Sequence, residues 1–108
     1  MFPAILDARA DQFSFEFANR EMKEAELWGQ HGDEREFSAG IVDVKSFWVE
    51  PPEEVAARIR AVMQNVRPEK LWVTPDCGFF QLPRWLAFQK MQRLVAGAAI
   101  VRRELEGR

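Results

Sequence analysis

The chain has 108 residues, 47% of them apolar, and its 15 basic and 17 acidic side chains leave a formal net charge of -2. This length suits one domain at most, and the interspersed charges form no basic stripe of the kind that nucleic acid requires. No apolar run approaches the roughly 18 residues of a membrane span, and the amino terminus lacks a signal-peptide pattern. We therefore expect a cytoplasmic protein with no nucleic acid and no membrane partner. Its single cysteine, Cys77, agrees with a reducing compartment.

The first half of the sequence predicts two strands and a helix. QFSFEF, residues 12–17, alternates phenylalanines with polar residues as a short strand does. ANREMKEAELW, residues 18–28, allows an apolar helix face. After a segment rich in glycine and charge, GIVDV, residues 40–44, predicts a second strand.

The second half repeats this alternation. Pro52 suits the first position of a helix, and Pro68 ends it. LWVT, residues 71–74, predicts a third strand, and Pro83 opens a long final helix. The core stripe expected on that helix comprises Trp85, Phe88, Leu94, Val95 and Ala98. We expect the tail VRRELEGR, residues 101–108, to lie in solvent.

The three predicted strands begin about 28 to 30 residues apart, which is the spacing of a βα unit. Such alternation predicts an α/β fold with parallel strands joined by right-handed crossovers. A (β/α)8 barrel needs about 250 residues, so three units make up a little under half of one. Residues 1–10 read as the end of a helix whose own strand is missing, and we expect the chain to be a piece of such a barrel.

Three chemically active side chains follow the three predicted strands. Glu16 ends the first, Lys45 follows the second and Cys77 follows the third. Ligands of parallel α/β folds bind at the carboxyl ends of the strands, so these residues are expected on one rim. A carboxylate, an amine and a thiol suit either a metal site or a nucleophile with acid and base help. The alternatives are a Cys77 that is merely a small buried apolar residue and a structural ion pair between Glu16 and Lys45.

At these residues the sequence resembles a known family. SFEFANREM, GIVDVKS and PEKLWVTPDCGFF resemble the carboxyl-terminal end of the cobalamin-independent methionine synthases, which are zinc-dependent barrel methyltransferases. The resemblance extends over nearly the whole chain, and PDCG after a Leu-Trp-Val strand is specific. It implies that residues 1–108 are the carboxyl-terminal portion of one TIM-barrel catalytic domain, its last three βα units.

The resemblance also implies two zinc ligands. The family holds zinc with an H-x-C motif, a glutamate at the end of a later strand and the cysteine of PDCG, and Glu16 and Cys77 match the last two. The H-x-C pair is absent, and the only histidine, His31, is expected on the surface in a connection at the opposite end. Zinc binding therefore needs additional ligands that this chain does not contain.

Lys45 marks a second departure from the family. The folate-using members carry a histidine in a D-x-H-S motif, thought to help protonate the departing folate nitrogen, and here the motif reads DVKS. Lys45 is the expected catalytic residue, as a proton donor or as a partner for negative charge, and the folate donor is in doubt. DVKSFWVE and GFFQLPRW look closer to short relatives such as the epoxyalkane to coenzyme M transferases. An ion pair of Lys45 with Asp43 or Glu16 is the alternative.

Two functional hypotheses follow. The first is the carboxyl-terminal part of a zinc-dependent S-methyl or S-alkyltransferase, whose partners are a small homocysteine-like thiol, an alkyl donor and the rest of the barrel in the same or another chain. The isolated chain would then be inactive. The second is a noncatalytic α/β module or half-barrel subunit that acts through assembly. Association into homo-oligomers is open under both hypotheses.

Overall fold

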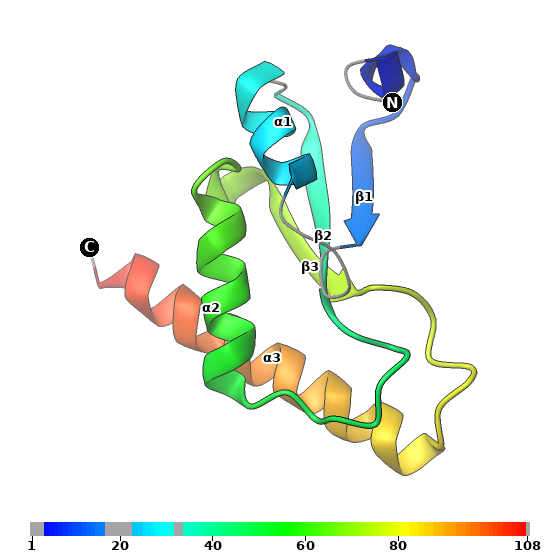
Figure 1. Ribbon diagram of the computed structural model, residues 1–108. Helices are drawn as coiled ribbons and strands as arrows, with labels where there is room; N and C mark the ends of the chain where they lie inside the picture. The colour runs from blue at the N-terminus through cyan, green and yellow to red at the C-terminus, as the bar shows by residue number, and fades with distance from the viewer. Residues whose placement is uncertain (1–3, 17–22, 32–33, 108) are drawn as a thin grey trace.

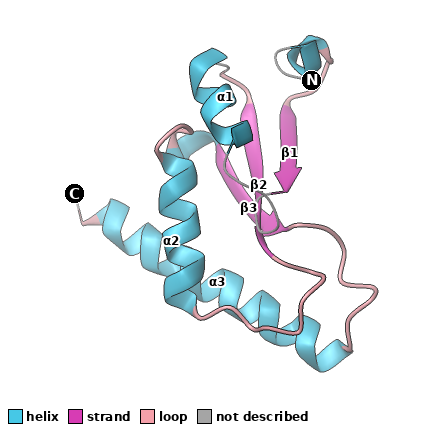
Figure 2. Ribbon diagram, viewed as in Figure 1, coloured by secondary structure: helices cyan, strands magenta, loops and turns pink. Residues whose placement is uncertain are grey.

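The structure is a computed structural model that describes residues 4–16, 23–31 and 34–107. Within these residues, parallel strands alternate with helices along the chain (Figures 1 and 2). The strands are β1 (Gln12–Glu16), β2 (Glu36–Val42) and β3 (Leu71–Pro75). The α-helices are α1 (Lys23–His31), α2 (Pro52–Met63) and α3 (Arg84–Glu106), and the short 3-10 helices are η1 (Ala4–Asp7) and η2 (Pro68–Lys70).

The sheet has the order β1-β2-β3, and both pairs of strands are parallel, as the alternation predicted. Phe37 of β2 pairs with Phe13 of β1 and Leu71 of β3 near the amino ends of the strands. β2 begins at Glu36, four residues earlier than expected. The reason is that Phe37 and Ala39 are fully buried although they follow a charged segment, so burial rather than local polarity decides where this strand starts.

One apolar core joins the sheet to the helices. Phe37, Ala39 and Ile41, alternate residues of β2, belong to the same buried cluster as side chains of α1, α2 and α3. Trp28 of α1 packs edge-on against Phe37, with 4.8 Å between the ring centroids. Such aromatic contacts bury large areas in a defined geometry, and they hold α1 against the first two strands.

The two longer helices cross each other beside the sheet (Figure 1). Gly97 of α3 lies at their contact, where an added Cβ would be 2.4 Å from Cγ1 of Val55 on α2. Only glycine permits so close an approach of the two helices. Arg60 of α2 and Glu104 of α3 form an ion pair that joins the same helices.

The predicted core stripe of α3 is partly wrong. Leu94 is buried as expected, whereas Trp85, Phe88 and Val95 are 60%, 65% and 64% exposed. The residues that α3 buries are Leu86, Lys90, Leu94, Gly97 and Val101. The tail is mostly exposed as expected, but Val101 is buried and Leu105 is half-buried, and α3 continues to Glu106.

In the part of the chain that the structure describes, none of the helices is both long and apolar enough to cross a membrane.

Candidate functional site

The register of the strands brings two predicted site residues to the same edge of the sheet. Glu16 is the last residue of β1, and its Cα is paired with that of Gly40 in β2. Gly40 is in turn paired with Thr74 of β3. Cys77 follows two residues after Pro75, where β3 ends. The backbone positions of Glu16 and Cys77 therefore both belong to the carboxyl-terminal edge.

Gly40 lies where the segment after β3 meets β2. A Cβ on Gly40 would be 2.8 Å from the Cα of Asp76 and 3.1 Å from the carbonyl oxygen of Phe15. The backbone N–H of Asp76 donates to the carbonyl of Val42 at 2.9 Å, next to an irregularity in the pairing between Gly40 and Val42. The backbone of Asp76, the residue before Cys77, is thus hydrogen-bonded to β2. β2 is the central strand and lies between β1 and β3.

Cys77 is a free and exposed thiol. The alternative that it is a small buried apolar residue is therefore wrong. A thiol at an exposed strand end is accessible to a metal ion, a substrate or a chemical reagent.

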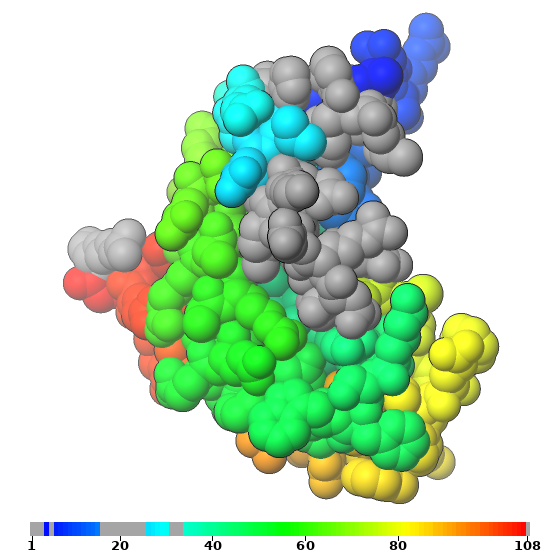
Figure 3. Space-filling model, in the orientation of Figure 1, coloured from blue at the N-terminus to red at the C-terminus, as the bar shows by residue number. Residues whose placement is uncertain are grey.

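Lys45 lies in the loop after β2, and its side chain is exposed. Its backbone N–H donates to Oδ1 of Asp43 at 2.8 Å, which stabilises the turn that follows the strand. Figure 3 shows that the segments after β2 and β3 gather at the same end of the molecule, as they do in Figure 1. The loop of Lys45 and the turn of Cys77 thus share one end of the fold.

The strand pairing places the backbones of Glu16 and Cys77 at one edge of the sheet, and their role as metal ligands stays a prediction. The side chain of Glu16 lies outside the described part of the structure, so its distance from the Cys77 thiol stays a prediction. Among the described residues, no three His, Cys, Asp or Glu side chains form a group that could hold a metal ion. His31 is the last residue of α1, immediately before the chain returns to the amino end of β2, so its backbone lies away from the edge of Glu16.

A buried ionic network, which the sequence did not reveal, supports the loop of Lys45. Lys90 of α3 is fully buried, and its amine donates to the carbonyls of Asp43 at 2.7 Å and Trp48 at 2.6 Å. It also donates to Oε1 of Glu50 at 3.1 Å. All three N–H groups of the ammonium are satisfied in this way, and two of the three acceptors are backbone atoms of the loop.

The second oxygen of Glu50 extends the network to the neighbouring helix. Oε2 accepts from the backbone N–H of Asp43 at 2.9 Å and from Arg58 of α2 at 3.1 Å. The same nitrogen of Arg58 donates to the carbonyl of Ile41 at 2.7 Å. Because β2, α2 and α3 all contribute, the loop of residues 43–50 is held at both of its ends.

One sequence signal could have identified this network. Lys90 occupies the same helical stripe as Leu86, Leu94 and Val101, and a lysine at a buried position needs an anionic partner and backbone acceptors. Glu50 precedes two prolines and is not an exposed helical residue, which made its role invisible to periodicity.

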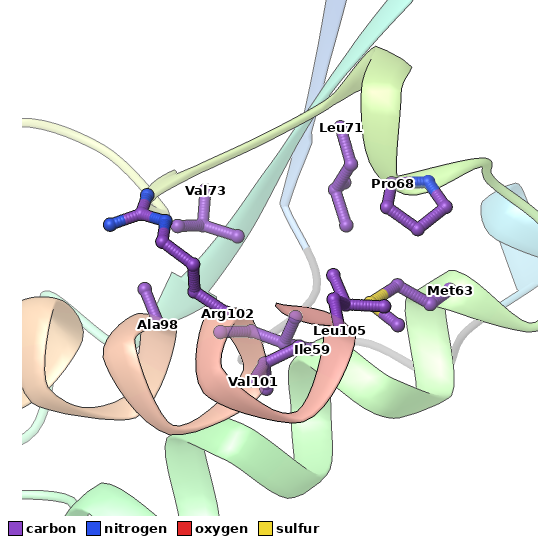
Figure 4. A pocket seen from close by; sticks show the side chains of 9 residues that line it. All are labelled: Ile59, Met63, Pro68, Leu71, Val73, Ala98, Val101, Arg102 and Leu105. Carbon is purple, nitrogen blue, oxygen red and sulfur yellow. The ribbon is translucent and has the colours of Figure 1, made fainter. Parts of the chain in front are cut away.

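A small apolar cavity lies away from this edge, between η2, the start of β3 and the two longer helices (Figure 4). Its volume is about 140 Å³. The lining side chains are Ile59, Met63, Pro68, Leu71, Val73, Ala98, Val101, Arg102 and Leu105. Its lining has one charged group and no nucleophile, so the cavity is not a candidate for catalysis.

Comparisons with known proteins agree with the resemblance of the sequence motifs. A family model described as "Cobalamin-independent synthase, Catalytic domain" matches residues 1–100. A methionine synthase of Saccharolobus islandicus is 39% identical over 104 residues, which are 96% of this chain and 31% of that relative. A methionine synthase of Thermococcus kodakarensis is 43% identical over 99 residues, which are 92% of this chain and 29% of that relative.

The fold is also that of a solved structure. A B12-independent methionine synthase from Shewanella sp. W3-18-1, determined in complex with selenomethionine, superposes with a TM-score of 0.89 at 31% sequence identity. The match covers 100% of this chain and 31% of that chain. This chain therefore spans a little under a third of the length of the relatives that it matches.

Proposed function

The chain belongs to the family of cobalamin-independent synthases, and on this premise we propose that it is part of the barrel of a zinc-dependent thiol methyltransferase. The fold is α/β and corresponds to part of the barrel of its structural relative. In this proposal Glu16 and Cys77 are two of the zinc ligands, and Lys45 is the catalytic residue beside them. The substrates are a small homocysteine-like thiol and an alkyl donor.

The observation that supports the proposal is the crowding around Gly40. The backbone next to Cys77 and the backbone next to Glu16 both lie within 3.1 Å of a Cβ placed on that glycine. Two segments that close on one glycine can carry their next side chains toward one point. A thiolate and a carboxylate are donors that suit zinc.

The donor types therefore fit zinc, although their number does not complete a site. Catalytic zinc sites usually have three protein ligands and one open position, so at least one further ligand has to come from outside the described residues. When bound, the ion would lower the pKa of a substrate thiol and supply the thiolate nucleophile. The residues of this chain would hold it: Cys77 through its sulfur and Glu16 through its carboxylate.

Lys45 would act on the alkyl donor, whereas the zinc ligands would act on the substrate thiol. Its ammonium can donate a proton to a departing group or offset the negative charge that develops there. It can also bind an anionic part of the substrate, such as a carboxylate or a sulfonate. The network of Lys90, Glu50 and Arg58 supports this assignment, because it holds the loop that carries Lys45.

The proposal also names a partner and a compartment. The remaining βα units of the barrel would come from the same or another polypeptide, and they would supply the missing ligands. A thiolate ligand and a thiol substrate both need a reducing environment, which favours the cytoplasm.

Reconstitution tests this function. The chain is assayed alone and together with the segment of the Thermococcus kodakarensis methionine synthase to which it is not similar. Zinc content and methionine formation from homocysteine are measured with methylfolate, and thioether formation is measured with an epoxide as the alkyl donor. We expect no product from the chain alone and product from the mixture with at least one donor.

A variant of Cys77 tests the role of its thiol in the same experiment. Cys77→Ser should lower zinc content and product together, because a hydroxyl is not deprotonated by zinc as readily as a thiol. Undiminished product from Cys77→Ser would refute the role of this thiol. A stable, metal-free assembly without transfer from either donor would favour the noncatalytic module.

A further inference from the structure

We propose that Gly40 is a positioning residue, whose missing side chain lets the turn that carries Cys77 close against the end of β1. The inference deepens the proposed function and rests on it for the pairing of Cys77 with Glu16. According to this inference, a glycine in the central strand sets the distance between the end of β1, which carries Glu16, and the turn that carries Cys77.

The first argument is the space around Gly40. A Cβ there would lie 2.6 Å from Oδ1 and 2.8 Å from Cα of Asp76. Real Cβ atoms essentially never come within 3.0 Å of another heavy atom in this way. The carboxylate could rotate away from a new methyl group, but the Cα of Asp76 can move only if the backbone of the turn moves.

The second argument is that β2 cannot move in place of the turn. Gly40 is buried, and its neighbours Ala39 and Ile41 are 0% exposed within the core. Displacing a close-packed strand disturbs many contacts at once. The residues after Asp76, in contrast, are exposed: Cys77 and Gly78 lie at the surface. A side chain at position 40 would therefore push the turn outward, stretching the bond from Asp76 N–H to the Val42 carbonyl.

The third argument is that β1 closes on the same glycine from the other side. The carbonyl oxygen of Phe15 would be 3.1 Å from a Cβ at position 40, and Phe15 directly precedes Glu16. A side chain at this position would thus separate the two segments from each other. The expected consequence is a wider gap between Cys77 and residue 16.

A disulfide between these positions measures that gap without any metal. Cys77 is the only native thiol, so Glu16→Cys creates a chain with one possible intramolecular pair. A disulfide requires Cα atoms within about 4.4 to 6.8 Å of each other. The Glu16→Cys chain is oxidised in dilute solution under native conditions, and intrachain disulfide is followed by non-reducing electrophoresis and mass spectrometry. We expect it to form readily, and at least tenfold more slowly when Gly40→Ala is added.

Gly97→Ala is the matched control for loss of stability. It places the same methyl group on another buried glycine, 2.4 Å from Cγ1 of Val55, at the crossing of α2 and α3. Its cross-linking rate should stay within twofold of that of Glu16→Cys alone.

Asp76→Ala is the second variant, because it removes the carboxylate and keeps the Cα that contacts Gly40. In the Asp76→Ala background, Gly40→Ala should still slow cross-linking at least tenfold, because the added methyl group meets the Cα of residue 76 and not only the carboxylate.

The outcomes separate the two proposals. An unchanged rate with Gly40→Ala, alone or in the Asp76→Ala background, would overturn the positioning role of Gly40 and leave the ligand pair intact. Failure of Glu16→Cys alone to cross-link would overturn the close approach of the two segments that the role of Gly40 requires. The ligand pair would stand, because a glutamate side chain and a bridging metal ion span a longer distance than a disulfide.

Discussion

At the scale of single residues, the chemistry of this chain centres on an exposed thiol that follows a parallel strand. A single thiol binds zinc weakly unless neighbouring side chains supply further ligands. Glu16 and Cys77 would supply two, whereas a catalytic zinc site usually has three protein ligands. We expect zinc to protect Cys77 of the isolated chain from alkylation only at high concentration, and a chelator to remove the protection at once. The alkylation rate with and without zinc measures this. Glu16→Gln should abolish the protection that remains at high zinc concentration. Tight one-to-one zinc binding by the chain alone would contradict the expectation of weak binding.

The catalytic role of Lys45 can be tested by substitution, because replacing this side chain should hardly change the stability of the protein. Its side chain is exposed, so Lys45→Ala should change the free energy of unfolding by no more than about 0.5 kcal/mol. In the reconstituted enzyme it should lower kcat by about 10²-fold if it donates a proton. It should raise KM instead if it binds an anionic substrate group. Lys45→His tests the donor, since a histidine at this position should improve turnover with methylfolate. Unchanged kcat and KM in Lys45→Ala would remove this residue from the mechanism.

At the scale of the elements, the network around Lys90 joins α3 to the loop between β2 and α2. Lys90→Met leaves the carboxylate of Glu50, which is 1% exposed, without its buried cation. Breaking a buried pair costs about 3 to 5 kcal/mol, and because Arg58 still pairs with the other oxygen of Glu50, we expect a loss at the lower end of this range. Urea unfolding of the wild type and the variant measures the difference.

The double variant Lys90→Met with Glu50→Leu separates stability from positioning. Glu50→Leu removes the carboxylate that Lys90 no longer neutralises, but it also leaves Arg58 and the N–H of Asp43 without this acceptor, so only part of the lost stability should return. The order of residues 43–50 should not return, because the two backbone carbonyls that Lys90 holds stay unpaired. Amide hydrogen exchange in this loop reports the difference. The exposed pair of Arg60 and Glu104 is the control, and Arg60→Ala should lower stability by less than about 1 kcal/mol.

The same elements explain how far the sequence alone could lead. Alternating patterns and the spacing of the βα units predicted three parallel strands, with Glu16 at the end of the first and Lys45 and Cys77 after the other two, because a helix between successive strands makes them parallel. The face of α3 was misassigned because Trp85 and Phe88 are as apolar as the residues that the helix buries. Periodicity cannot rank two apolar faces of one helix. Nor can it reveal a contact such as that of Lys90 with Asp43, which are 47 residues apart.

At the scale of the whole molecule, the described structure leaves apolar surface on α3 and at the edge of the sheet. Phe88 and Val95 are 65% and 64% exposed, and Trp72 of the edge strand β3 is 56% exposed. Large exposed apolar surfaces and open strand edges are sites of association. We expect the isolated chain to self-associate as its concentration rises, which sedimentation velocity can measure.

Charged substitutions on this surface should reverse the association. Phe88→Glu together with Val95→Lys should shift the chain toward the monomer without lowering the free energy of unfolding, because both side chains are largely exposed. Arg93→Glu changes an exposed charge on the same helix and is the control. A concentration-independent monomer in the wild type would contradict the expectation.

The ionic contact of Lys90 also bears on the order in which the protein is made. Glu50 precedes Lys90 by 40 residues, and at a synthesis rate of about 5 to 20 residues per second this interval lasts roughly two to eight seconds. Until Lys90 is synthesised, the carboxylate of Glu50 has Arg58 but not Lys90 beside it, and the carbonyls of Asp43 and Trp48 lack the amine that holds them. The rim is therefore completed only after the three strands that support it have been synthesised.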